Sequence, residues 1–226
     1  MRKAQPNESE TKRRMLEVAA ALLAEHGFEV VSVRDVTQAA KMNVAAVNYH
    51  FGSRDGLMAR VMEEALRHFN EERLARLQGL EKRFAGKPAP LEEVLEAWLK
   101  PLASAAQRSS WKDPVTALLI GRVLTLPVDK VPTEISQTHA GIDERVRRLL
   151  SKTLTPLSVG EISWRMHGLL GALVHTLVSP MMSGLLNAAS VEAIMARFVK
   201  FAAAAMREGA DSLPPTKNSP QATFDF

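Results

Sequence analysis

The sequence predicts an all-α protein with a three-helix N-terminal domain containing a helix-turn-helix, followed by a larger helical domain. Apolar residues recur at helical spacing along most of the chain, and no segment has a convincing alternating pattern typical of strands. Capping residues and Pro or Gly breaks divide this pattern into segments of helix length. Hydrophobic residues make up 46% of the 226 residues, which is enough for a sizeable core.

The stretch 32–57 predicts a helix-turn-helix unit. Ser32 and Asp35 have capping-box spacing, so a short helix is expected to begin directly after Ser32. Lys41 interrupts its apolar pattern, and Asn43 is a suitable N-cap for a second short helix. This arrangement allows one helix to cross the DNA backbone while the next enters the major groove, although an ordinary helical hairpin has the same outline.

The flanking segments favour DNA binding over the plain hairpin. A helix expected from Ser9 carries its apolar residues on one face and ends at Gly27. After the second short helix, Phe51 supplies an aromatic plug and Ser53 an N-cap for a fourth helix.

These motifs resemble the N-terminal domain of TetR-family transcriptional regulators. The similarity covers roughly residues 15–61 and includes Gly27-Phe28, the segment 31–36 and the segment 48–54. The family usually has glycine in the turn where this chain has Lys41, so this lysine is expected to adopt a positive φ at a modest cost.

The second helix of the motif carries few charges, so it would read bases through amides and small apolar groups. Asparagine can pair with adenine, and small apolar side chains can touch thymine methyl groups. Tyrosine and histidine can reach phosphates, and the resemblance implies that Ser32, Lys41, Ser53 and Arg54 hold the DNA backbone. The predicted DNA site therefore contains Ser32, Lys41, Asn43, Val44, Ala45, Ala46, Asn48, Tyr49, His50, Ser53 and Arg54. Val47 and Phe51 are assigned to the core.

Composition narrows the class of protein. The formal net charge is +4, and the basic cluster at residues 2–14 is either an arm along phosphates or a solvated tail. The chain has no cysteine, which excludes disulfides and thiolate metal sites and suits a reducing cytoplasm. The first residues are too polar for a signal peptide.

We divide the chain into a DNA-binding domain at residues 1–52, an effector-binding and dimerisation domain at residues 53–208, and a disordered tail at residues 209–226. Pro101 lies inside an expected helix and should kink or divide it. After the motif, helices are expected over 53–78, 91–106, 113–126 and 133–153, then from Ser158 and from Ser190.

The segment 166–191 has no charged residue and is long enough to span a bilayer. Small and polar residues interrupt it along one stripe, however, which favours a helix buried between helices or subunits. One DNA-binding domain contacts too little DNA for useful specificity, so we expect a homodimer on a palindromic operator. The last two helices have the apolar faces that a symmetric interface needs, and TetR-like proteins usually dimerise through these helices.

The remaining helices suggest a site for a small hydrophobic effector. Its predicted lining is Trp98, Trp111, Arg122, Trp164, Met166, Leu170 and Val174. Arg122 would either meet a ligand oxyanion or reach solvent or a glutamate. No metal or cofactor is expected, because His167 and His175 are too far apart for a clean chelate pair. The segments 164–167 and 171–172 resemble the branch that includes fatty-acid-responsive PsrA-type repressors, which implies an acyl or similar effector.

The sequence therefore predicts a homodimeric, sequence-specific DNA-binding regulator, a repressor released by a hydrophobic effector. An activator is an open alternative, and so is a helical lipid carrier with a vestigial DNA head. No nucleophile–base–orienter set or phosphate-binding Gly loop is recognisable, so the chain is not expected to be an enzyme.

Overall fold

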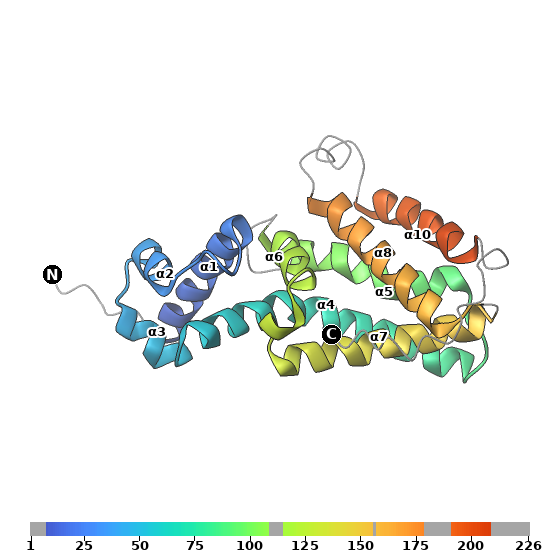
Figure 1. The fold of residues 1–226 in the computed structure, drawn as a ribbon, viewed down its shortest axis with the longest axis horizontal. Coiled ribbons are helices and arrows are strands. Elements are labelled where there is room, and N and C mark those ends of the chain that lie inside the picture. Colours follow the sequence, from blue (N-terminus) through green and yellow to red (C-terminus); the bar gives the residue numbers. More distant parts are fainter. Residues whose placement is uncertain (1–7, 109–114, 156, 179–190, 209–226) are drawn as a thin grey trace.

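A computed structural model describes residues 8–108, 115–155, 157–178 and 191–208, and within these ranges the chain is helical without strands, which confirms the predicted fold class (Figure 1). The elements are α1 (Glu8–His26), α2 (Val33–Ala40), α3 (Val44–Phe51), α4 (Arg54–Phe84), α5 (Leu91–Arg108), α6 (Val115–Leu124), the 3-10 helix η1 (Val128–Lys130), α7 (Thr133–Thr153), α8 (Val159–Val178) and α10 (Val191–Arg207). The predicted tail at 209–226, the central part of the predicted uncharged helix and the basic residues before position 8 lie outside the described residues.

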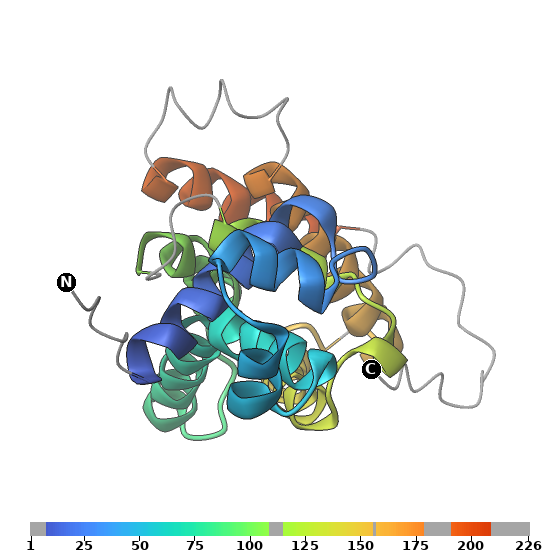
Figure 2. The same ribbon diagram turned by 90° about the vertical axis from the view of Figure 1, so that its left-hand side faces the viewer.

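Helices α1–α3 form one end of the molecule, against the beginning of α4 (Figures 1 and 2). From there α4 extends into the larger group of helices, where it packs on α5, α6 and α7. Helix α10 packs on α5 and α8, and α6 also contacts α1. The two ends of the molecule are therefore connected both by α4 and by the contact between α6 and α1. The predicted boundary at residues 52 and 53 stays a prediction.

The small helical end has an apolar core built from helix faces with three- and four-residue spacing. Met15, Ala19 and Leu23 of α1 are fully buried, and they belong to one core with Val36 of α2 and Val47 of α3. The expected core role of Val47 is confirmed, and Phe51 is partly buried against the same core. This packing leaves the opposite face of α3 exposed to solvent.

Helix α4 is longer than the sequence predicts, because its apolar face continues past Gln78 with the buried residue Leu80. It ends at Ala85, which has a left-handed φ of 47°, followed by Gly86 at φ 87°. With 31 residues, α4 is long enough to connect both groups of helices.

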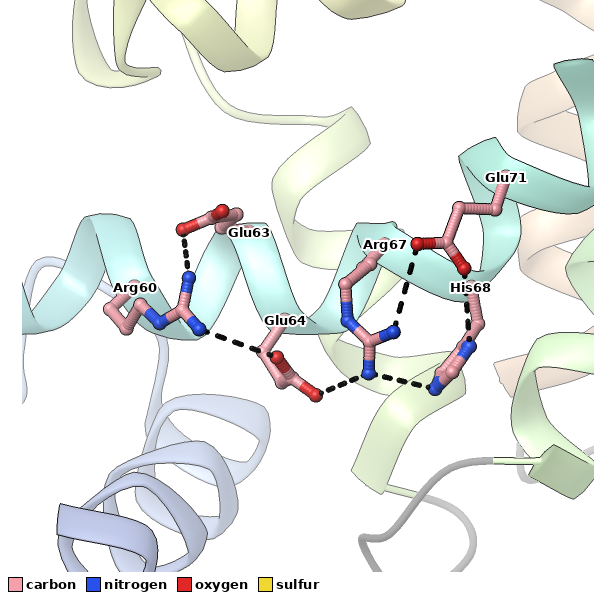
Figure 3. A network of polar contacts seen from close by, with 6 residues as sticks. All are labelled: Arg60, Glu63, Glu64, Arg67, His68 and Glu71. Carbon is pink, nitrogen blue, oxygen red and sulfur yellow. Dashed lines mark hydrogen bonds and ion pairs between the residues drawn. The ribbon is translucent and has the colours of Figure 1, made fainter. Parts of the chain in front are cut away.

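Charged side chains three and four residues apart stabilise the more polar face of α4 (Figure 3). A hydrogen bond from Arg67 holds the pKa of Glu64 below its ordinary value, since it favours the ionised carboxylate. The network comprises Arg60, Glu63, Glu64, Arg67, His68 and Glu71. These pairs support a continuous, stiff helix along the middle of α4.

Helix α5 continues through Pro101, so this proline does not divide the helix, and the alternative that it kinks the helix stays a prediction. Trp98 and Leu99 before the proline and Leu102 after it are all buried. The helix packs against α4 on one side and α10 on another. We attribute its continuity to this burial, which offsets the hydrogen bond that proline cannot make.

Helices α8 and α10 are joined by the buried Arg165. Its Nη1 donates to the carbonyl oxygens of Ala205, Met206 and Glu208, which are orphan acceptors at the end of α10. The predicted cap of α8 is present, since the N–H of Glu161 donates to Ser158 Oγ at 3.1 Å. None of the helices in the described ranges combines the length and hydropathy that crossing a bilayer requires.

Candidate nucleic-acid interface

A reciprocal capping box fixes the start of α2. The backbone N–H of Ser32 donates to Asp35 Oδ2 at 2.8 Å, and the N–H of Asp35 donates to Ser32 Oγ at 3.3 Å. Hydrogen bonds from the Ser32 hydroxyl and N–H lower the pKa of Asp35, since both favour its ionised form. The predicted cap is confirmed.

The turn between α2 and α3 depends on a left-handed residue. Lys41 has φ 56° and ψ 47°, which confirms the positive φ expected there. Its N–H donates to Gln38 O at 3.1 Å, and the N–H of Met42 donates to Thr37 O at 2.8 Å. This is a Schellman motif, which satisfies the last carbonyls of α2 and reverses the chain within a few residues.

Replacing Lys41 with glycine should raise the free energy of unfolding by about 1 kcal/mol, because glycine adopts the left-handed conformation without the steric cost. Urea denaturation of the full chain measures this effect. Lys41→Arg is the matched control, since it keeps the cation and the strain and should leave stability unchanged. A glycine variant no more stable than the wild type would contradict a strained turn.

Helix α3 presents a largely apolar and amide-bearing face. Asn43 Oδ1 accepts a hydrogen bond from the N–H of Ala45 at 2.9 Å, so this oxygen caps the helix and the side-chain NH2 is what remains for a base. Tyr49 is 74% exposed, and its ring lies edge-on to His50 with the centroids 4.9 Å apart. Of the other predicted contacts on α3, Val44, Ala45 and Asn48 are exposed, while Ala46 and His50 are partly buried.

The N-terminus of α4 borders this face. Ser53 is exposed and caps α4 by accepting a hydrogen bond from the N–H of Gly56 at 3.0 Å. Arg54 requires a correction, because its guanidinium donates to the carbonyl oxygens of Phe28 and Val31. It positions the loop before α2 against α4 instead of being held ready for phosphate.

Two further cations border the interface on other helices. Lys12 of α1 is exposed, with its Nζ 6.0 Å from the centre of the Phe51 ring at the end of α3. Arg34 in the first turn of α2 is exposed as well, and it is not among the residues predicted for the DNA site. Its position two residues after the capping serine could have predicted a phosphate contact, since the N-terminus of a helix is a favourable site for backbone phosphates.

The predicted effector residues are brought together only in part, within one apolar core and not around a cavity that the described residues show. Trp98 and Met166 are buried, and Leu170 and Val174 are partly buried against the core. Trp164 is 69% exposed on α8, so it does not line an enclosed pocket within one protomer, and Trp111 lies outside the described residues.

Arg122 has partners other than those predicted for it. Its Nε donates to Ala24 O and its Nη2 to Glu25 O, both at 2.8 Å, so it caps the end of α1 from α6. A cavity of about 220 Å³ does occur between the ends of α4 and α7, but no predicted effector residue lines it.

Two family models cover most of the chain. The model of bacterial regulatory proteins of the tetR family matches residues 15–61, and the model of the tetracyclin repressor-like C-terminal domain matches residues 96–205. The chain belongs to the TetR family. The N-terminal match coincides with α1–α3 and the beginning of α4.

One curated transcriptional regulator is similar to a part of this chain. The probable HTH-type transcriptional regulator YttP of Bacillus subtilis (strain 168) is 37% identical over 54 residues, a match that covers 24% of this chain and 26% of YttP. The match thus spans about a quarter of that curated relative.

Solved structures extend the likeness in fold to nearly the whole chain. The putative tetR-family regulator from Shewanella sp. PV-4 superposes with a TM-score of 0.58 at 16% identity, covering 87% of this chain and 96% of that one. PfmR from Thermus thermophilus gives 0.57 at 19% identity, covering 86% and 94%. FadR from Bacillus halodurans, a fatty acid degradation regulator, gives 0.58 at 14% identity, covering 89% and 96%.

Proposed function

We propose that this TetR-family protein is a homodimeric, sequence-specific DNA-binding regulator, a repressor released by a small hydrophobic effector. The observation that carries the proposal is the exposed face of α3, held by the Schellman turn at Lys41 and the cap at Asn43. An exposed helix presenting Asn48 and Tyr49, bordered by helix N-termini and cations, suits entry into a major groove between two phosphate backbones.

Exposed apolar side chains on α8 and α10 support dimerisation. Trp164 is 69% exposed and Val159 58% exposed on α8, while Phe201 is 57% exposed on α10. Large exposed aromatic residues on adjacent helices are typical of protein–protein interfaces. Two-fold pairing through these helices would hold two α3 helices for half-sites about one DNA turn, ~34–36 Å, apart.

Effector control would act on the distance between the two DNA-binding domains of the dimer. A ligand that binds better to a form with more widely separated DNA-binding domains shifts the population away from the form that fits DNA. Helix α4 and the hydrogen bonds of Arg122 to the end of α1 connect the larger group of helices to the DNA-binding end. The apolar interior of α5–α8 suits a hydrophobic effector, and the PsrA-type resemblance makes an acyl compound part of the proposal.

Selection of bound duplexes from a random DNA pool, at a stated salt concentration, tests the function. A palindromic motif with half-sites about one turn apart is the expected result. Binding that is sensitive to salt but indifferent to sequence would contradict the proposal and favour a ligand carrier with a vestigial DNA head.

Arg122→Ala should weaken the attachment of α1 to α6 by about 1–2 kcal/mol, because two carbonyl acceptors lose a charged donor. Hydrogen exchange of amides near the end of α1 should become faster, with operator affinity reduced and the dimer intact. Arg148→Ala is the control, since Arg148 lies exposed on α7. Unchanged exchange and unchanged DNA affinity in the Arg122 variant would contradict the coupling.

A further inference from the structure

A buried arginine between α4 and α7 makes fewer hydrogen bonds than its charge requires. Arg73 of α4 has no exposed surface, and its Nη2 donates to Asp143 Oδ1 of α7 at 3.1 Å. Its Nε and Nη1 are buried and have no hydrogen-bond partner among the described residues. The Cζ atom of Arg73 lies over the Phe69 ring, 4.6 Å from its centre.

This arrangement is costly for a pair that only joins two helices. A guanidinium carries five N–H donors and keeps its charge in proteins, and a buried charge is normally paired and fully hydrogen-bonded. Burial lowers the pKa of Arg73, since it disfavours the charged form, while the carboxylate of Asp143 opposes this. Asp143 occupies Nη2 and leaves the N–H groups on the other two nitrogens without an acceptor.

Neighbouring buried polar atoms also lack hydrogen-bond partners. Asn70 lies three residues before Arg73 on the same side of α4, and its Oδ1 is buried without a partner. On α7, His139 Nδ1 is also buried without a partner, while its Nε2 lies 3.7 Å from Asp143 Oδ2. Unsatisfied donors and acceptors from two helices thus gather around Arg73 and Asp143.

The ion pair between Arg145 and Glu81 provides a contrast within the same two helices. Arg145 Nη1 on α7 donates to Glu81 Oε2 on α4 at 2.6 Å, and both side chains are about one-third exposed. A structural link between α4 and α7 therefore exists where water can satisfy the remaining donors. Arg73 differs because its Nε and Nη1 have no surface exposed to bulk solvent.

We propose that Arg73 binds the oxyanion head group, a carboxylate or a phosphate, of a hydrophobic effector whose apolar body lies among the helices packed on α4. An oxyanion is the ligand that satisfies several N–H donors of one guanidinium at once. This inference rests on the proposed effector-controlled function and adds the chemical class of the effector. The unpartnered Nδ1 of His139 supplies a further hydrogen-bond donor beside the head group in the tautomer that carries its proton there.

The test compares ligands that share a tail and differ only in the head group. Alkanoates from butanoate to hexadecanoate, alkyl phosphates and alkanols of equal length are titrated into the full-length protein by calorimetry and thermal shift. At least one oxyanion series should bind about 10- to 100-fold more tightly than its alkanol, the range expected for a charged hydrogen bond. The series that wins distinguishes a carboxylate from a phosphate ligand.

Paired substitutions assign the preference to Arg73. The variant Arg73→Met with Asp143→Leu removes the buried guanidinium together with its partly exposed carboxylate partner, so no unpaired charge is left behind, and should bind oxyanion and alkanol equally. Arg145→Met with Glu81→Leu is the matched control between the same helices and should keep the preference. Arg73→Lys retains the positive charge and should keep part of the preference for an oxyanion over the alkanol.

Two results would overturn the inference: no oxyanion preference in the wild type, including no binding of any probe, or a full preference in the folded Arg73/Asp143 double variant. Duplex selection with the same wild-type sample separates the two proposals. A palindromic motif without oxyanion preference rejects only the effector class, whereas oxyanion binding without a motif rejects only the DNA-binding function.

Discussion

Replacing Tyr49 with alanine is expected to lower operator affinity by about 2 kcal/mol per dimer, roughly 30-fold, if each hydroxyl makes one net phosphate hydrogen bond of about 1 kcal/mol. The free-energy loss is twice that of one contact, because two-fold symmetry removes the contact from both half-sites. Tyr49 is 74% exposed, so its loss should not disturb the core that holds α3. Fluorescence anisotropy on the selected duplex, at one fixed salt concentration, measures the change.

Tyr49→Phe separates the hydroxyl from the ring, and it should reproduce most of the loss if the hydroxyl donates to phosphate. Circular dichroism and sedimentation should show an unchanged fold and an unchanged oligomer for both variants. Val30→Ala is the matched control, because Val30 is 72% exposed and lies outside α3. Wild-type affinity in Tyr49→Ala would remove Tyr49 from the interface.

Trp164→Ala should weaken dimerisation by about 4 kcal/mol, nearly a thousand-fold, if the residue is an interface hot spot in both protomers. The side chain is 69% exposed within one protomer, so truncation removes little of the protomer's own packing. The physical reason is the loss of two large apolar surfaces that would be buried on association. Sedimentation equilibrium over a range of protein concentrations measures the dissociation constant.

The same variant should also lose operator affinity at low protein concentration, since a monomer engages one half-site. Adding protein should restore DNA binding, which distinguishes a dimerisation defect from damage to the reading head. Val30→Ala again serves as the exposed apolar control. A dimer as tight as the wild type would show that the surface around Trp164 is not the interface.

The unit from α1 to the beginning of α4 could be predicted from the sequence because its signals are local. The capping box at Ser32, the N-cap at Asn43 and the positive φ at Lys41 depend on residues within a few positions of one another. Each of these features is confirmed. Helix α7 also matches its predicted bounds at Thr133 and Thr153, where a proline precedes the helix and sets its start.

Misjudged features depend on partners distant in sequence. Arg54 was expected to face phosphate, but its acceptors are carbonyls more than twenty positions earlier in the chain. Arg122 was expected in a ligand site, and its acceptors lie nearly one hundred positions away at the end of α1. A polar side chain next to an apolar stretch looks the same in sequence whether it meets a ligand or a distant backbone.

The effector region shows the same limit. Three tryptophans suggested a pocket, yet Trp98 is buried in the core while Trp164 is exposed on α8. The sequence does not predict the burial of Arg73, because this residue lies within a highly charged helix, where other arginines form exposed ion pairs. Its complete burial follows only from the packing of α7 and the other helices onto α4.

Local residue patterns were enough for the helical class and the turn geometry of the DNA-reading motif, since caps, breaks and apolar spacing act through neighbours along the chain. Long-range packing was needed to establish that Arg122 caps α1, that Trp164 faces outward and that Arg73 is buried with unsatisfied donors. These outcomes depend on which helix faces meet, and burial by a distant helix leaves no local signal in the chain.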